Sequence, residues 1–317
     1  DRSPSRGLGD VYKRQEVNGA LSSRDTSVST AVSALRGAKP RLMSESKFAR
    51  VFWGDSAGMT IATSAQVSAP STTPFIVAHR GASGLHPEST LRAFDEALKM
   101  DGVHGIECDV RLTRDGRLVV HHDALINRTS NGAGRIAKMD LAELRQFNYG
   151  TEDDPQELLL LNDLLDLLQD YPDKHIYIET KHPTRFGPEV DEQTVRTLWY
   201  RGMKEDPRVH LISFSHSAMR YFTHVVPELE TFYLFRLREK KWNPTNTMLS
   251  RPYGVGPALA HLRGKPKLLG YRGLKTYTWT VNEPEHMRWC RDNGVNVFAT
   301  DHPHIAVEAF RTPDTAM

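Results

Sequence analysis

The chain has 317 residues, a formal net charge of +2, 39% hydrophobic residues and only two cysteines. Its length suits one large domain or two small ones, and its composition is that of a globular protein. The near balance of 41 basic and 39 acidic residues argues against a nucleic-acid-binding protein. It also gives no support for attachment to an anionic membrane surface.

Cysteine usage argues against a disulfide-rich protein, and hydropathy argues against a transmembrane protein. Cys108 and Cys290 are too few for a disulfide framework, and they fit a reducing compartment. The sequence has no run of about 20 apolar residues, so we expect no transmembrane helix and no integral membrane association. From these features we predict a cytoplasmic protein.

Residues 1–74 differ from the rest of the chain. They are rich in Ser, Thr, Ala and Gly, show no sustained hydrophobic period and end in the linker-like stretch SAQVSAPSTTP at 64–74. Such a composition is typical of segments outside a packed core. We expect a disordered N-terminal extension over 1–74 and a folded domain over 75–317.

From residue 75 onward, short apolar runs alternate with amphipathic segments. The first run, FIVAH at 75–79, has the pattern of a strand buried on both faces. Similar runs predict strands at 105–112, 116–123 (after an RDG turn), 175–180, 209–214, 230–235, 253–257, 276–281 and 295–300.

Helices are predicted between most of these strands. Ser89 or Thr90 can cap the first one, because apolar residues follow at helical spacing from Leu91. The other predicted helices are 136–148 with Asp140 as its cap, 161–172, 191–202, 215–225, one beginning at Asn282 and one after Asp301.

The alternation of strands and helices favours an α/β protein with a parallel sheet. Residues 75–317 number 243, close to the ~250 of a closed eightfold barrel. We therefore predict a TIM (β/α)8 barrel with a small insertion after the second strand, at roughly 112–150.

Polar residues gather where the predicted strands end. Glu107 and Asp109 are two residues apart in one strand, so their side chains point to the same side. The carboxyl ends of the strands of a parallel barrel meet at one face, which holds the active site. The same pocket would therefore collect His79, Arg80, His122, Glu179, Lys181 and Trp279.

This collection of side chains has a coherent chemistry. Three carboxylates form an oxygen-rich site that suits Mg²⁺ or Ca²⁺ better than Zn²⁺. Arg80 and Lys181 add positive charge suited to a phosphate. Two histidines can divide acid and base duties near neutral pH. Hydrolysis of a phosphodiester needs these three components together.

Five segments carry a joint pattern: AHRGASGLHPESTLRAF (78–94), IECDVRLTRDGRLVVHHDALINRTSNGAG (106–134), IYIETK (176–181), TWTVN (278–282) and ATDHP (299–303). Together they resemble the glycerophosphodiester phosphodiesterase family, of the phosphatidylinositol-phospholipase-C-like TIM barrel superfamily. The resemblance covers roughly residues 75–310. It implies a hydrolase of lipid and glycerol metabolism that splits glycerophosphodiesters into an alcohol and sn-glycerol 3-phosphate.

The resemblance also implies a role for most residues of the predicted pocket. His79 and His122 match the catalytic pair, and the substrate is a small molecule. One divalent cation, Mg²⁺ or Ca²⁺ with Mn²⁺ as a further candidate, would be held by Glu107, Asp109 and Glu179. Arg80 and Lys181 match the family's residues on the phosphate side. Independently of the resemblance, a strand-end Trp279 could belong to the core, but we favour a pocket position in which it packs against the glycerol or alcohol moiety. We also assign Glu88 to the substrate side.

One departure from the family pattern lies beside Glu88. The family usually has H-P-E-N-T, and this chain has HPEST, with Ser89 in place of Asn. Because Ser caps a helix about as well as Asn, we expect little loss.

The chemistry leaves alternatives open. One histidine could deprotonate the glycerol hydroxyl next to the phosphate, giving a cyclic phosphate, while the other protonates the departing alcohol; direct attack by water fits equally well. Two other functions stay possible for the same barrel. These are lysophospholipase D activity and non-catalytic binding of a sugar phosphate.

The remaining polar residues receive structural interpretations. We expect His121 to point away from His122 and Asp123 to contact His122. Asn282 and Asp301 are predicted to be helix caps. The basic run at 236–241 is predicted to be a solvated face.

Overall fold

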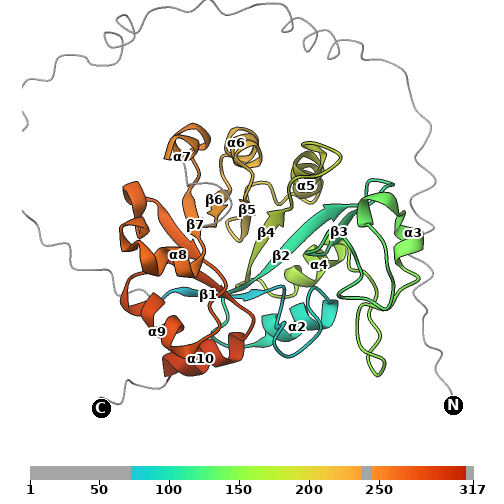
Figure 1. Cartoon of the computed structure of the whole chain (residues 1–317), viewed down its shortest axis with the longest axis horizontal. Helices are drawn as coiled ribbons and strands as arrows, with labels where there is room; N and C mark the ends of the chain where they lie inside the picture. Colours follow the sequence, from blue (N-terminus) through green and yellow to red (C-terminus); the bar gives the residue numbers. More distant parts are fainter. Residues whose placement is uncertain (1–72, 237–243, 312–317) are drawn as a thin grey trace, which may run out of the picture. The chain divides into compact units, whose positions relative to one another are not determined.

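The computed structural model describes residues 73–236 and 244–311 (Figure 1). The predicted disordered extension lies outside these residues except for its last two positions, and the basic run lies outside them except for Arg236. The extension and the domain bounds of 75–317 therefore stay predictions.

Eight parallel strands form a closed barrel. Their order around the ring is β1, β9, β8, β7, β6, β5, β4 and β2, and β2 pairs with β1 to close it. This arrangement confirms the predicted TIM barrel. The strands are β1 (Phe75–His79), β2 (Gly105–Leu112), β4 (His175–Thr180), β5 (Val209–Ser213), β6 (Glu230–Phe235), β7 (Gly254–Pro257), β8 (Lys275–Thr278) and β9 (Val297–Thr300).

Helices surround the strands (Figure 1). Several pack an apolar stripe against the barrel; in α4 the stripe consists of four buried leucines between Leu161 and Leu168. The helices are α2 (Leu91–Lys99), α4 (Leu161–Gln169), α5 (Glu189–Tyr200), α6 (His216–Val225), α7 (Pro244–Ser250), α8 (Leu259–Gly264), α9 (Pro284–Asp292) and α10 (Pro303–Arg311), with 3₁₀ turns η4 (Pro266–Leu268) and η5 (Tyr271–Gly273).

The hydrophobic core has two layers, because alternate residues of each strand point inward and outward. Outward residues such as Ile76 and Ile106 pack against the helices in a large cluster. Inward residues such as Val77, Tyr177 and Tyr277 fill the barrel itself. A barrel filled in this way leaves its polar chemistry at the strand ends.

The segment between β2 and α4 holds the predicted insertion. Strand β3 (Leu118–Val120) pairs antiparallel with β2, and a small apolar cluster around Ile126 and Leu144 packs the segment together. The single helix predicted over 136–148 is wrong. The chain forms a 3₁₀ turn, η3 (Ile136–Lys138), and a short helix, α3 (Leu141–Leu144), since Met139 is extended and Asp140 forms a capping box with Glu143.

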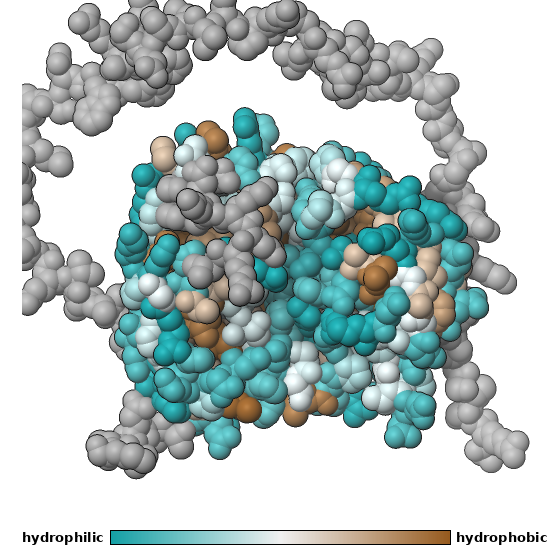
Figure 2. Space-filling view, in the orientation of Figure 1, coloured by the Kyte–Doolittle hydropathy of each residue, from teal (hydrophilic) through white to brown (hydrophobic). Residues whose placement is uncertain are grey.

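Among the residues that the structure describes, no helix is long and apolar enough to cross a membrane. Figure 2 shows that hydrophobic residues on the face in view form small separate groups, and that hydrophilic residues surround a depression near its middle.

Candidate active site

The strand register places four predicted site residues side by side. His79, the last residue of β1, is paired with Glu107 of β2. Two residues further along β2, Asp109 is paired with Glu179 of β4. Because side chains two residues apart share a face of the strand, Glu107 and Asp109 both point to the pocket. The strand pairing thus brings these four side chains, which are separated in the sequence, into one cluster.

Three buried carboxylates form the centre of this cluster. Glu107, Asp109 and Glu179 are only 2%, 0% and 7% exposed, and each offers an oxygen within 4.8 Å of the others. Two cations lie against them. The Lys181 ammonium is 2.9 Å from Asp109 Oδ1 and 2.7 Å from Glu179 Oε1, and Arg80 Nε is 3.3 Å from Asp109 Oδ2.

The proton affinities of the carboxylates reflect crowding of negative charge. Burial, together with the charges of Asp109 and Glu179, raises the pKa of Glu107 well above its usual range. Burial raises the pKa of Glu179 to about 7, although Lys181 opposes the shift. Burial would also raise the pKa of Asp109, but Lys181 and Arg80 together lower it below its usual range. An added cation would relieve this repulsion.

The donor set fits a hard divalent cation. It consists of three carboxylates and no sulfur, the ligand type that Mg²⁺ and Ca²⁺ prefer. Both oxygens of Asp109 are buried, and among the described residues the Lys181 ammonium and the Arg80 guanidinium lie against them. Buried carboxylates are costly in a native protein unless cations compensate them, and a metal ion would add to these two protein cations.

His79 lies between two carboxylates on opposite sides of its ring. Its Nε2 is 3.8 Å from Glu107 Oε2, and its Nδ1 is 2.7 Å from Asp301 Oδ1. Asp301 follows β9, the neighbour of β1 in the barrel. A carboxylate at Nδ1 keeps the proton on that nitrogen and leaves Nε2 directed at the pocket.

The predicted helix caps Asn282 and Asp301 are wrong. Asp301 accepts hydrogen bonds from Ser83 Oγ and Asn282 Nδ2, at 3.1 and 2.7 Å, and α9 begins only at Pro284, with Glu283 as its cap residue. The two polar residues thus hold the orientation of His79. A polar residue directly after β9 is the signal that could have identified Asp301, since the same signal identified His79.

His122 has its own carboxylate partner. Its Nδ1 is 2.6 Å from Asp123 Oδ1, which confirms the predicted contact. Burial lowers the pKa of His122 to about 4, and the nearby cations Lys181 and Arg80 add to the effect. The ring is therefore neutral at pH 7. His121 is buried, with its two nitrogens on the Asp123 carbonyl and the Thr129 hydroxyl, so its predicted structural role is confirmed.

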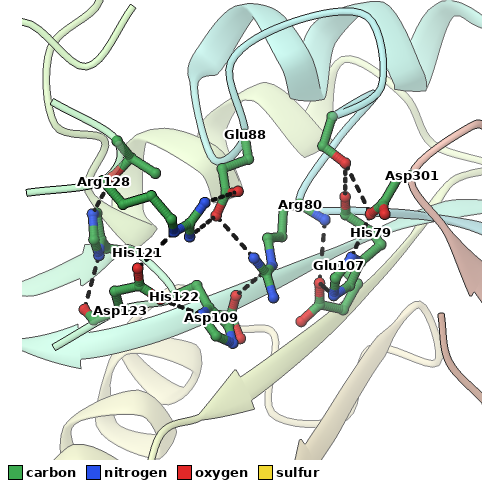
Figure 3. A network of polar contacts seen from close by, with 12 residues as sticks. His79, Arg80, Glu88, Glu107, Asp109, His121, His122, Asp123, Arg128 and Asp301 are labelled. Carbon is green, nitrogen blue, oxygen red and sulfur yellow. Dashed lines mark hydrogen bonds and ion pairs between the residues drawn. The ribbon is translucent and has the colours of Figure 1, made fainter. Parts of the chain in front are cut away.

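A chain of ion pairs joins the two histidine environments (Figure 3). Arg128 bonds Asp123 through Nε at 2.7 Å, and its two terminal nitrogens bond both oxygens of Glu88 at 2.6 and 2.7 Å. Glu88 also accepts from Arg80 Nη1 at 2.9 Å. The insertion that carries Arg128 is thereby tied to the loop after β1, and Glu88 uses its carboxylate on two arginines.

The loop after β1 has an unusual backbone. Arg80 and Ser89 adopt φ values of 59° and 61°, a region that non-glycine residues rarely occupy. Gly81, which follows Arg80, has φ 81°, and a Cβ on Gly81 would lie 2.6 Å from the backbone of Ala93. The helix cap is Thr90, whose hydroxyl accepts from Ala93 N. The expectation that Ser89 substitutes for Asn as a cap is therefore wrong, because position 89 requires a left-handed residue.

The side chains of the site line a cavity of about 160 Å³, which has a charged half and a mostly apolar half. The charged half is lined by the histidines, two of the carboxylates, Arg80 and Lys181. The other half is mostly apolar and aromatic, and it includes Trp279, as predicted. Its lining residues are Ile212, Phe214, Leu234, Arg236, Tyr277, Trp279 and Thr280.

Arg236 was not among the predicted site residues. Its side chain is exposed, as expected for a solvated face, but its guanidinium also lies over the rings of Phe214 and Trp279 and lines the pocket. Its position directly after β6 is the signal that could have identified it.

Comparison with known proteins agrees with this geometry. The model of the Glycerophosphoryl diester phosphodiesterase family matches residues 79–305. A Mycobacterium tuberculosis protein named probable glycerophosphodiester phosphodiesterase 1 is 39% identical over 249 residues, covering 73% of this chain and 90% of its own length. The glycerophosphodiester phosphodiesterase of Caldanaerobacter subterraneus is 30% identical over 244 residues, covering 74% and 97%.

Solved structures share the fold. The structure of an Oleispira antarctica phosphodiesterase in complex with its product sn-glycerol-3-phosphate has a TM-score of 0.68 at 24% identity and covers 76% of this chain and 98% of that one. A putative glycerophosphoryl diester phosphodiesterase from Silicibacter pomeroyi has a TM-score of 0.63 at 25% identity, covering 75% and 93%. With the family match and the relatives, these findings show that the chain belongs to the glycerophosphoryl diester phosphodiesterase family and is a phosphoric diester hydrolase on a TIM barrel.

Proposed function

We propose that the protein is a metal-dependent enzyme that hydrolyses glycerophosphodiesters to an alcohol and sn-glycerol 3-phosphate. One observation carries the proposal. Two histidines, each with an aspartate at Nδ1, flank three buried carboxylates in a single pocket. The names of the relatives and the product held by the Oleispira enzyme support the choice of substrate.

Glu107, Asp109 and Glu179 would hold one divalent cation, Mg²⁺ or Ca²⁺, with Mn²⁺ as a further candidate. When bound, such an ion supplies positive charge that stabilises the phosphoryl oxygens in the transition state. Lys181 and Arg80 contribute fixed charge from the protein on the same side of the pocket. We assign both residues to the phosphate, in addition to their contacts with Asp109.

The two histidines divide proton transfer between them. His122 is neutral at pH 7 because its pKa is about 4, so we assign it as the base that takes the proton of the nucleophile. The Asp301 carboxylate at Nδ1 of His79 directs Nε2 at the pocket, so we assign His79 as the acid at the leaving oxygen. General acid–base catalysis of this kind contributes about 10²–10⁴-fold to the rate.

The nucleophile in this proposal is the glycerol hydroxyl adjacent to the phosphate. Its attack expels the alcohol and gives a cyclic glycerol phosphate, which water opens with the two histidine roles reversed. Rapid-quench sampling during the first turnover should detect the cyclic ester. Its absence at all times, with formation of sn-glycerol 3-phosphate at the full rate, would favour direct attack by water.

Glu88 has a positioning role in this scheme. Its carboxylate would repel a phosphate, and its oxygens are used by Arg80 and Arg128. We therefore revise its predicted contact with substrate and propose that Glu88 holds the Arg80 guanidinium toward the pocket.

The size of the cavity favours deacylated substrates over lysophospholipids. A volume of about 160 Å³ is small beside the 300–1,000 Å³ of typical ligand pockets, so an acyl chain would have to lie outside it. The test is a panel of glycerophosphodiesters and lysophospholipids with added Mg²⁺, Mn²⁺ or Ca²⁺, with release of sn-glycerol 3-phosphate as the readout for the diesters. Turnover of lysophospholipid alone, or of no phosphodiester, would contradict the proposal.

A further inference from the structure

The aromatic half of the pocket contains a corner built by two rings. Phe214 follows β5 and Trp279 follows β8. Their ring centroids are 5.2 Å apart and their planes meet at 86°. Trp279 Nε1 donates to the Gly256 carbonyl at 3.1 Å, which fixes the plane of the indole. Two ring faces at nearly a right angle form the kind of surface that attracts a cation.

The cation at this corner belongs to the protein itself. Arg236, directly after β6, places its Cζ 5.1 Å from the Phe214 centroid and 4.9 Å from the Trp279 centroid. Both distances lie within the ~6 Å over which a ring attracts a guanidinium. All three side chains line the same cavity as His79 and Lys181, so Arg236 is part of the pocket wall.

The occupied corner has a consequence for the alcohol part of the substrate. Aromatic corners are used to bind quaternary ammonium groups, such as that of choline. Here a choline group would have to displace the guanidinium or lie beside a like charge. A glycerol or other polyol headgroup carries no charge and meets no such repulsion. Like-charge juxtaposition is a common means of rejecting a ligand.

We propose that Arg236 is a specificity-determining residue that disfavours diesters with a quaternary ammonium headgroup relative to diesters with an uncharged polyol headgroup. The inference rests on the proposed function, with the phosphate in the charged half of the pocket and the headgroup in the aromatic half. A purely structural role for Arg236, holding Phe214 and Trp279 in place, would affect all headgroups alike.

The test compares two substrates that differ only in the headgroup, glycerophosphocholine and glycerophosphoglycerol. We measure kcat/KM for both in the wild type, Arg236→Ala and Arg236→Lys. Arg236→Ala should raise the choline-to-glycerol ratio of kcat/KM about tenfold, because the corner then accepts the ammonium group. Arg236→Lys keeps a cation and should leave the ratio within about twofold of wild type.

A matched control tests whether replacing another arginine that lies over an aromatic ring has the same effect as replacing Arg236. Arg291 of α9 lies 5.9 Å from the Phe310 centroid, outside the barrel, and Arg291→Ala should leave the ratio unchanged. Thermal melting of each variant checks that it is folded. An unchanged ratio in folded Arg236→Ala, or an equal change for both substrates, would overturn the proposal.

A second measurement distinguishes failure of this inference from failure of the proposed function. Calorimetric titration with glycerophosphocholine, with metal and without turnover in the His122→Ala background, should show about tenfold tighter binding when Arg236→Ala is added. If the wild-type enzyme hydrolyses neither diester, the proposed function is wrong. Equal affinity with and without Arg236 would reject the inference about this residue independently of activity.

Discussion

Asp301 and His79 are 222 positions apart in the chain, yet Oδ1 of the aspartate lies 2.7 Å from Nδ1 of the histidine. The contact exists because β9 and β1 are neighbours in the closed ring. His79 lowers the pKa of Asp301 below its usual range, against the opposing effect of burial. The carboxylate is therefore ionised at all pH values where the enzyme would work, and it fixes the tautomer of His79.

We predict that Asp301→Asn lowers kcat by about 10²-fold or more, because the amide no longer holds the proton on Nδ1 of His79. The pH dependence of kcat should also differ from that of the wild type. The benchmark is His79→Ala or His122→Ala, each expected to cost about 10²–10⁴-fold. A loss of less than threefold in Asp301→Asn, in a protein with wild-type melting temperature, would contradict the positioning role.

The metal site predicts both lost activity and lost stability on chelation. Removal of divalent ions leaves three crowded carboxylates, so activity should disappear and the melting temperature should fall. Saturating ion at about 100 times its Kd stabilises the folded state by ~2.7 kcal/mol. Glu179→Gln should weaken the response of the melting temperature to added Mg²⁺ or Ca²⁺. Activity that survives exhaustive chelation would exclude the metal.

We expect Glu88 to affect activity by positioning Arg80. In Glu88→Gln the neutral amide no longer balances Arg80 and Arg128, so we expect kcat/KM to fall about tenfold, as charge-assisted bonds contribute ~1.5–3 kcal/mol. The matched control is Arg92→Ala, which breaks an exposed ion pair with Asp154 and should change little. Equal behaviour of the two variants would show that the Glu88 network is not needed.

Ser89 is a site where the family's usual Asn should be stabilising. Its φ of 61° suits Asn better than Ser, and its Oγ is buried with no hydrogen-bond partner among the described residues. We expect Ser89→Asn to raise the free energy of unfolding by about 0.5–1 kcal/mol. Ser89→Gly tests the backbone effect alone. Destabilisation by both variants in urea unfolding would show that strain at position 89 is negligible.

Acid sensitivity should arise at the opposite end of the barrel from the active site. His175 Nδ1 lies 2.9 Å from His210 Nε2, and burial, with His210, lowers the pKa of His175 to about 4. The unfolded state, with a histidine pKa near 6.5, binds more protons than the folded state between pH 6.5 and 4. Stability is therefore lost as the pH falls through this window.

The measurement is urea unfolding at pH 7.5 and pH 5. Replacement of His175 by Gln should reduce the loss between the two pH values by on the order of 1–2 kcal/mol, allowing for partial solvent screening. His224→Gln, at an exposed position of α6, serves as the control. If the His175 variant loses as much stability between pH 7.5 and pH 5 as the wild type does, protonation of this histidine does not contribute to the acid sensitivity.

The sequence by itself determined the barrel and most of the pocket. Alternating strand and helix patterns indicated the fold, since periodicity is a local property. The pair Glu107 and Asp109, and the strand-end positions of His79 and Glu179, were readable because parallel strand ends meet at one face. The break of the predicted helix at Met139 was not readable, because the helical period continues across it while packing of the insertion decides the backbone.

Only the tertiary structure decided which residues serve which partner. Asp301 and Asn282 have the local signature of helix caps, and only closure of the ring brings them to His79. Arg236 lies in a basic run that suggests a solvated face, yet the curvature of the barrel brings Phe214 and Trp279 under it. A side chain's partners depend on long-range contacts, and these are set by how strands distant in sequence pack together rather than by any local pattern.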